Sequence, residues 1–210
     1  ILNITSDKCY HNDESGKNPQ IHKNINKIPS IFTIFGLTGN LAERKIIPSL
    51  WHLFKNNHLP KQLAIIGFSR RDLSPKELES LVRESVEKHS DSKIAEEDFA
   101  SFFKFFSYQA GTFVSKGAFS SLSDHITQVE KSWGVCTNKL YYLAVPPLFY
   151  EQILKNLASV KLNVPCGGEL GWSRILIEKP FGTNLASAEK LQSLLSTYFK
   201  EEQIYRIDHY

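Results

Sequence analysis

The sequence lacks methionine entirely, even at its first position, although it has 210 residues. From this absence we expect a piece of a longer chain. Cysteine is also scarce: only Cys9, Cys136 and Cys166 are present, which is an odd number, and their spacing is not that of metal ligands. We therefore expect ordinary thiols in a reducing compartment, with neither a disulfide framework nor a metal site.

The chain also lacks a long apolar run and an excess of charge of either sign. It has 25 Lys+Arg against 22 Asp+Glu, a net charge of +3, with no basic stripe. The absence of a long apolar run excludes a membrane span. The absence of a basic stripe gives no indication of a nucleic-acid-binding surface. A hydrophobic fraction of 41% is enough to form a core and excludes a wholly disordered chain. The length favours one domain.

Two regions of different texture make up the chain. Residues 1–29 are polar and rich in turn formers, and we expect a flexible tail there. The tail has no apolar segment for secretion and is too acidic for a transit peptide, so a cytoplasmic location is expected. Residues 30–210 alternate short apolar runs with amphipathic stretches, which predicts a Rossmann-like α/β domain with a doubly wound, mainly parallel sheet.

The expected elements follow this alternation. Strands are predicted at 31–35, 63–67, 103–109, 139–144, 174–178 and near 203–206. Helices are predicted at 116–133, 148–159 and 184–199, and another opens at Ser74 with a capping pattern. Pro48 predicts a short turn over 41–46, followed by a second helix that the proline begins.

The first strand runs into a G-x-x-G-x-x-A pattern that starts at Gly36. A turn that brings backbone N–H groups against a pyrophosphate needs residues without bulk, such as Gly36 and Gly39, and the helix that follows supplies a positive dipole. Thr38 adds a hydroxyl donor for the same phosphate. The pattern favours dinucleotide binding, although two glycines can also be simple turn chemistry.

The second strand ends in Arg70, Arg71 and Asp72. At this place an acidic side chain selects NAD, and an arginine accepts the 2′-phosphate of NADP. The arginines favour NADP, unless they are only solvated. Asp72 could take the acidic role instead, but the adjacent Ser74 makes it look like part of a helix entry.

Two later strand ends carry further candidates. The strand through Ala144 is stopped by a double proline, which places its end at the sheet edge where cofactors lie. Glu178 and Lys179 follow three aliphatic residues, and a cis bond to Pro180 would fix the direction of the lysine. Its ammonium could meet a substrate hydroxyl or a cofactor carboxamide, or the two residues could simply pair with each other.

The last residues, 205–210, include Asp208, His209 and Tyr210. These residue types are plausible phosphate ligands and acid or base groups. Terminal residues can equally be exposed and unused.

Taken in order, these segments resemble the glucose-6-phosphate dehydrogenase family. The cofactor motif matches residues 36–45, with Thr38 and Asn40 in place of the family's serine and aspartate, and Arg70 matches the second-strand arginine. The tyrosine-rich strand matches 141–147, Glu-Lys-Pro-Phe-Gly matches 178–182, and Arg-Ile-Asp-His-Tyr matches 206–210. The resemblance covers residues 31–210.

The resemblance implies a role for each matching residue. NADP would be held by Gly36, Thr38, Gly39, Leu41 and Arg70, with Ala144, Glu178 and Lys179 near its nicotinamide half. Lys179 would also contact glucose 6-phosphate, whose phosphate His209 and Tyr210 would bind. Asp208 would orient a catalytic histidine that the family carries further downstream.

The resemblance also implies that the family's C-terminal β+α domain and its general base are absent from these residues. A base must reach the hydroxyl that it deprotonates, so we expect the isolated chain to bind NADP weakly and to turn over no sugar phosphate. The full-length parent would be a homodimer or tetramer that oxidises glucose 6-phosphate at C1, the first step of the pentose phosphate pathway. One alternative is a non-catalytic homologue that pairs with active subunits, and another is a different Rossmann reductase.

Overall fold

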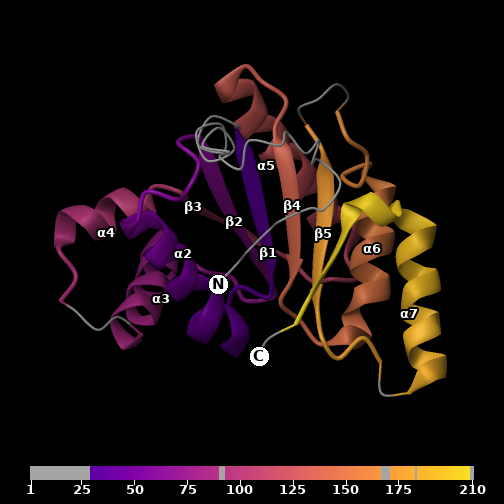
Figure 1. Ribbon diagram of the computed structural model, residues 1–210. Coiled ribbons are helices and arrows are strands. Elements are labelled where there is room, and N and C mark those ends of the chain that lie inside the picture. The colour runs from indigo at the N-terminus through magenta and orange to yellow at the C-terminus, as the bar shows by residue number, and fades with distance from the viewer. Residues whose placement is uncertain (1–28, 90–92, 167–170, 183, 209–210) are drawn as a thin grey trace, which may run out of the picture.

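The computed structural model describes residues 29–89, 93–166, 171–182 and 184–208. A six-stranded sheet forms its centre, and every neighbouring pair of strands is parallel. The strands are β1 (Ser30–Phe35), β2 (Leu63–Ser69), β3 (Phe106–Ala110), β4 (Asn138–Leu143), β5 (Ser173–Glu178) and β6 (Ile204–Ile207). Their order is β3-β2-β1-β4-β5-β6. Helices cover both faces (Figure 1), so the predicted doubly wound sheet is confirmed.

Two hydrophobic clusters lie on the two faces of the sheet. In β1, Ile31 and Phe35 belong to one cluster, and Phe32 and Ile34 to the other, because successive side chains of a strand alternate. The first cluster includes α5 (Lys116–Trp133), α6 (Tyr150–Ser159), which follows the 3₁₀ turn η2 (Pro147–Phe149), and α7 (Leu185–Tyr198). The second includes α2 (Ile47–Lys55), α3 (Pro75–Lys88) and α4 (Glu96–Phe103). The short turn η3 (Glu201–Gln203) leads into β6.

The helices begin and end at residues suited to those positions. Ser74 forms the predicted capping box, since its hydroxyl accepts from the Glu77 N–H and the Glu77 carboxylate accepts from the Ser74 N–H. Ser115 caps α5, which ends at Gly134 with φ +68°. Among the described helices, none is both long enough and apolar enough to cross a membrane.

The helix around Pro48 differs from the predicted turn and second helix. Residues 40–55 are continuously helical, and the π-helical segment η1 (Ala42–Ile46) leads directly into α2. Pro48 lies in the first turn of α2, as predicted. Proline has no N–H for the helix ladder, and it is accommodated here where the hydrogen-bond register changes.

The predicted strand at 103–109 starts too early. Residues up to Phe103 belong to α4, whose first turn is acidic, and β3 begins at Phe106. Acidic residues stabilise a helix N-terminus. The Phe102 ring also packs on Trp51 of α2, with a centroid distance of 5.2 Å. The aromatic residues that resembled the start of a strand therefore form the end of α4, where they pack against α2.

The expectation of ordinary thiols is wrong for two of the three cysteines. Cys136 and Cys166 form a disulfide, with their Cα atoms 6.3 Å apart. They precede β4 and β5, which are neighbours in the sheet. The sheet therefore brings together residues that are 30 positions apart in the sequence. Cys9 lies outside the described residues.

Candidate functional site

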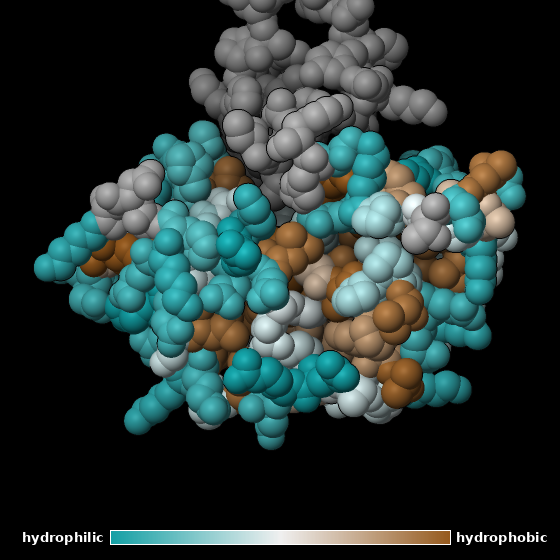
Figure 2. All heavy atoms as spheres, turned by 90° about the horizontal axis from the view of Figure 1, so that it is seen from below, coloured by the Kyte–Doolittle hydropathy of each residue, from teal (hydrophilic) through white to brown (hydrophobic). Residues whose placement is uncertain are grey.

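The candidate site lies along the carboxyl edge of the parallel strands, at the bottom of Figure 1. In an open α/β sheet, ligands bind at this edge, where the strand order reverses. The order here reverses between β1 and β4. Figure 2 looks onto this edge from below and shows hydrophobic and near-neutral residues in its middle, with hydrophilic residues around them.

Gly36 lies at the point of reversal. It follows β1 with φ +92°, and its N–H donates to the Phe68 carbonyl at 2.7 Å. A Cβ atom on Gly36 would lie 2.5 Å from the Ala144 carbonyl oxygen and 2.7 Å from Val145 Cγ1. The ends of β1, β2 and β4 therefore meet closely at this residue, and only glycine fits there.

The turn after Gly36 closes onto a helix N-terminus. The Gly39 N–H donates to the Gly36 carbonyl at 2.9 Å, and the Glu43 N–H donates to the Gly39 carbonyl at 3.1 Å. The helix begins at Asn40, followed by the half-buried Leu41. The first N–H groups of a helix have no acceptor within it, and its dipole favours an anion there. This arrangement fits a dinucleotide pyrophosphate.

A chain of hydroxyl groups joins the glycine turn to the ends of β2 and β3. Thr38 Oγ1 lies 3.0 Å from Ser69 Oγ, which lies 2.6 Å from the Tyr108 hydroxyl. The Tyr108 hydroxyl donates to the Arg71 carbonyl at 2.6 Å. A carbonyl only accepts, so Tyr108 accepts from Ser69, and Ser69 in turn accepts from Thr38. The Thr38 proton is therefore directed at Ser69, which refines the idea that this hydroxyl donates to a phosphate.

Arg70 follows the last residue of β2, at the position where a ribose 2′-substituent is recognised in this topology. Its side chain is exposed and has no hydrogen-bond or ion-pair partner within the described part of the chain. Arg71 is exposed as well, but its carbonyl accepts the Tyr108 bond. That bond holds the backbone immediately after Arg70.

Glu178, at the end of β5, contacts two tyrosines. The Tyr142 hydroxyl donates to Glu178 Oε1. Burial, together with the hydrogen bond to this carboxylate, raises the pKa of Tyr142, so the hydroxyl stays protonated and continues to donate. Burial and the same carboxylate raise the pKa of Tyr150 to about 12. The bond from Tyr142 therefore holds the Glu178 carboxylate in one position at the end of β5.

Lys179 and Asp208 are brought together from the ends of β5 and β6. Their side chains form an ion pair, and the Lys179 N–H donates to the Ile207 carbonyl at 3.2 Å. The bond between Lys179 and Pro180 is cis, the isomer considered from the sequence. His209 and Tyr210, predicted as phosphate ligands, lie outside the described residues.

Sequence reasoning missed the residues that position the predicted ones. Ser69, Tyr108 and Tyr142 are buried or half-buried polar residues on strands, and each bonds to a predicted residue or its neighbour. The sequence signal that could have identified them is a hydroxyl group within or at the end of a buried strand, because such a group needs a hydrogen-bond partner. The strand order was needed to identify those partners.

The strand order and the glycine turn at its reversal define a dinucleotide-binding domain of the dehydrogenase type. A family model described as "Glucose-6-phosphate dehydrogenase, NAD binding domain" matches residues 33–210. The chain belongs to this family, which binds a nicotinamide dinucleotide.

Individual relatives agree with this membership. The chain is 35% identical to the glucose-6-phosphate 1-dehydrogenase of Ceratitis capitata over 183 residues, which cover 87% of this chain and 33% of the relative. It is 36% identical to the Takifugu rubripes enzyme over 204 residues, covering 97% of this chain and 35% of the relative. A solved glucose-6-phosphate dehydrogenase in complex with glucose 6-phosphate superposes with a TM-score of 0.77 at 32% identity, covering 87% of this chain and 37% of that chain. The chain thus spans about a third of the length of these relatives.

Proposed function

We propose that this chain is the NADP-binding part of a glucose-6-phosphate dehydrogenase. Such an enzyme oxidises glucose 6-phosphate at C1 to 6-phosphogluconolactone, the first step of the pentose phosphate pathway. The observation that carries the proposal is the contact between Gly36 and Ala144 at the reversal of strand order, with Arg70 at the end of β2. The relatives support the substrate, since they are named for it.

In this proposal each strand end has its own task. The turn through Gly36, Gly39 and Leu41 binds the pyrophosphate, and Arg70 binds the 2′-phosphate. Thr38 donates its hydroxyl proton to a phosphate oxygen when cofactor binding turns that proton away from Ser69. The nicotinamide supplies the acceptor for the hydride that leaves C1.

The residues at the ends of β4, β5 and β6 surround the nicotinamide half and the sugar. Ala144 provides a small surface beside Glu178, whose position Tyr142 holds. Lys179 exchanges its bond to Asp208 for one to the sugar, which leaves Asp208 to orient a histidine from the rest of the enzyme. His209 and Tyr210 complete the site as ligands of the sugar phosphate.

The full-length parent protein also has a proposed location, oligomeric state and set of partners. We assign it to the cytoplasm as a homodimer or tetramer that acts on glucose 6-phosphate, without nucleic-acid or membrane partners. We assign residues 1–29 to a tail and 30–210 to the cofactor domain. Isolated from the rest of the enzyme, the chain should bind the dinucleotide but not reduce it.

Calorimetric titration of NADP and NAD tests the cofactor assignment. A charge-assisted bond to the 2′-phosphate contributes about 1.5–3 kcal/mol, so Arg70→Ala should weaken NADP binding roughly 10- to 150-fold and leave NAD binding nearly unchanged. Arg71→Ala is the matched control, because that neighbouring side chain is equally exposed. Equal losses of NADP and NAD affinity in Arg70→Ala would reject the role.

Absorbance at 340 nm tests whether the isolated chain can reduce NADP. The isolated chain, given NADP and glucose 6-phosphate, should produce no steady rise in NADPH above a no-enzyme blank. The same chain extended by the remainder of its parent should produce one. Turnover by the isolated chain would mean that the catalytic base lies within these residues.

A further inference from the structure

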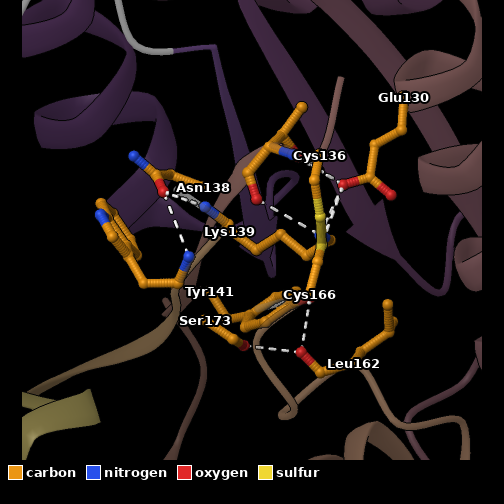
Figure 3. The surroundings of a disulfide bond; sticks show 11 residues. Glu130, Cys136, Asn138, Lys139, Tyr141, Leu162, Cys166 and Ser173 are labelled. Atoms are coloured by element: carbon orange, nitrogen blue, oxygen red, sulfur yellow. Dashed lines mark hydrogen bonds and ion pairs between the residues drawn. A yellow bond between two sulfur atoms is a disulfide. The ribbon is translucent and has the colours of Figure 1, made fainter. Parts of the chain in front are cut away.

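The edge of the sheet opposite the candidate site carries a compact cluster around the disulfide (Figure 3). Cys136 lies just before β4 and Cys166 before β5, while Glu130 reaches the cluster from α5. Lys139 points to the same place from β4. None of these residues takes part in the proposed dehydrogenase chemistry at the carboxyl edge.

A buried ammonium group lies against the disulfide. The Lys139 side chain is only 6% exposed, and its Nζ lies 3.1 Å from Cys166 Sγ. The same Nζ donates to Glu130 Oε1 at 2.6 Å and to the Thr137 carbonyl at 3.3 Å. A buried ion pair is weak evidence for stability, because apolar residues of the same volume often stabilise a fold equally well. The placement of the lysine therefore calls for another reason.

The carboxylate in this cluster is already satisfied. Glu130 Oε1 accepts from the Thr137 N–H and from the Thr137 hydroxyl, each at 2.9 Å, as well as from Lys139. It lies 3.7 Å from Cys166 Sγ, further than the ammonium does. The sulfur of Cys166 thus has a cation as its nearer charged neighbour.

The two cysteines differ in access as well as in surroundings. Cys166 is exposed, whereas Cys136 is half-buried. A nearby cation favours the thiolate form of a cysteine, and thiolate is the reactive form. Access and charge therefore single out the same sulfur.

We propose that Cys166 and Cys136 form a reversible thiol–disulfide site for low-molecular-weight disulfides, in which Cys166 is the attacking thiol, Cys136 resolves it and Lys139 stabilises the thiolate. In the first step the Cys166 thiolate attacks one sulfur of a disulfide R–S–S–R. A mixed disulfide forms on Cys166, and R–S⁻ leaves.

In the second step the Cys136 thiol loses its proton to solvent, and its sulfur attacks Cys166 Sγ. The mixed disulfide breaks, the Cys136–Cys166 bond forms, and a second R–S⁻ leaves. Two cysteine thiols are oxidised, one small disulfide is reduced to two thiols, and the two protons lost by the cysteines balance the two R–S⁻ groups. Excess small thiol drives the same steps backwards.

The first experiment equilibrates the Cys9→Ser chain in buffers of reduced and oxidised glutathione and then alkylates the free thiols. Cys136 and Cys166 should become alkylatable together as the share of reduced glutathione rises, and should pair again when it falls. A disulfide that stays closed throughout, or thiols that never pair, would overturn the proposal. Zinc bound by the reduced chain through Glu130 and both cysteines would overturn it too, because the groups would then form a metal site.

The second experiment separates the roles of the two cysteines in the Cys9→Ser background. Cys136→Ser should accumulate one glutathione per chain on Cys166. Cys166→Ser should react about ten times more slowly with oxidised glutathione at pH 7. Equal rates, or a faster reaction at Cys136, would contradict the assignment.

The third experiment tests Lys139 through the alkylation rate of Cys166 in the Cys136→Ser chain. Lys139→Met should lower that rate about ten-fold at pH 7, while the control Lys131→Met, on the exposed face of α5, should not change it. A circular dichroism spectrum checks that both variants fold.

If Lys139→Met fails to fold, the pH profile of alkylation in the Cys136→Ser chain decides. The charged groups around the thiol are Lys139 and Glu130, while burial raises the pKa of nearby Tyr141 and keeps it neutral. Half-maximal reactivity should fall below about pH 8.5, the value of an unperturbed cysteine. A midpoint at or above that value would remove Lys139 from the proposal.

Discussion

Replacement of Gly36 by alanine should lower the free energy of unfolding by more than the backbone strain of an alanine at this position would alone. Two costs combine at this residue. An L-residue in the left-handed region costs about 1–2 kcal/mol, and Gly36 has φ +92°. The new methyl group would also lie 2.5 Å from the Ala144 carbonyl oxygen. Overpacking of this kind costs about 1–3 kcal/mol more.

Gly134→Ala is the matched control because it carries the first cost without the second. Gly134 has φ +68°, and a Cβ atom there would meet nothing within 4 Å. Its free energy of unfolding should therefore fall by about 1–2 kcal/mol, and that of Gly36→Ala by about 2–5 kcal/mol. For a chain of this size the melting temperature falls by about 2–4 °C per kcal/mol.

Urea unfolding followed by circular dichroism at 222 nm measures both variants against the parent chain. Equal losses would refute the reasoning, because they would mean that β1 and β4 separate at no cost where Gly36 touches Ala144. A smaller loss in Gly36→Ala would mean that the turn itself is not held in the left-handed region.

Two further changes probe the groups that hold the site and the opposite edge. Tyr108→Phe removes the end of the hydroxyl chain that bonds the Arg71 carbonyl, so the preference for NADP over NAD should fall roughly 2- to 12-fold in calorimetric titrations. Tyr205→Phe on β6 serves as its control, and an unchanged preference in Tyr108→Phe would contradict the positioning role. Burial raises the pKa of Glu130, but the donors Lys139 and Thr137 lower it more, so that the pKa lies below its ordinary value of 4.5. The ionised carboxylate therefore stabilises the fold above that pH, and this stabilisation is lost as the pH falls through the lowered pKa. Glu130→Gln should accordingly melt lower than the parent at pH 7, with the gap closing below about pH 4.5; a gap that stays constant with pH would argue against the ion pair.

Much of the fold follows from local pattern. Helix α5 was predicted at its observed bounds, and in the structure Ser115 caps its start, Gly134 ends it and its apolar residues face the sheet. Helix α4 was missed, since its phenylalanines continue into β3 without a break in composition. Only the packing of Phe102 against Trp51 distinguishes helix from strand there.

The places of Gly36 and Arg70 could be predicted because each directly follows a single strand, while their roles in binding stay predictions. The site was not predictable where two strands cooperate. Tyr108 and Ser69 meet because β2 and β3 pair in one register. Cys136 and Cys166 meet because β4 and β5 are neighbours, which the sequence positions of the two cysteines alone do not show.

The two edges of the sheet share β4, which raises the question of whether the disulfide influences the dinucleotide. Hydrogen bonds on both sides hold this strand, because it pairs with β1 from Asn138 to Leu143 and with β5 from Lys139 to Tyr142. A strand bonded on both sides in the core opens only at a cost close to that of global unfolding. Reduction at Cys136 should therefore leave Ala144 in place, and NADP affinity measured by calorimetry should agree within about two-fold between the oxidised chain and the chain reduced by excess thiol, since each ten-fold change would require about 1.4 kcal/mol. A ten-fold difference would show that β4 shifts along its neighbours and couples the two edges, whereas agreement would make the sulfur chemistry independent of cofactor binding.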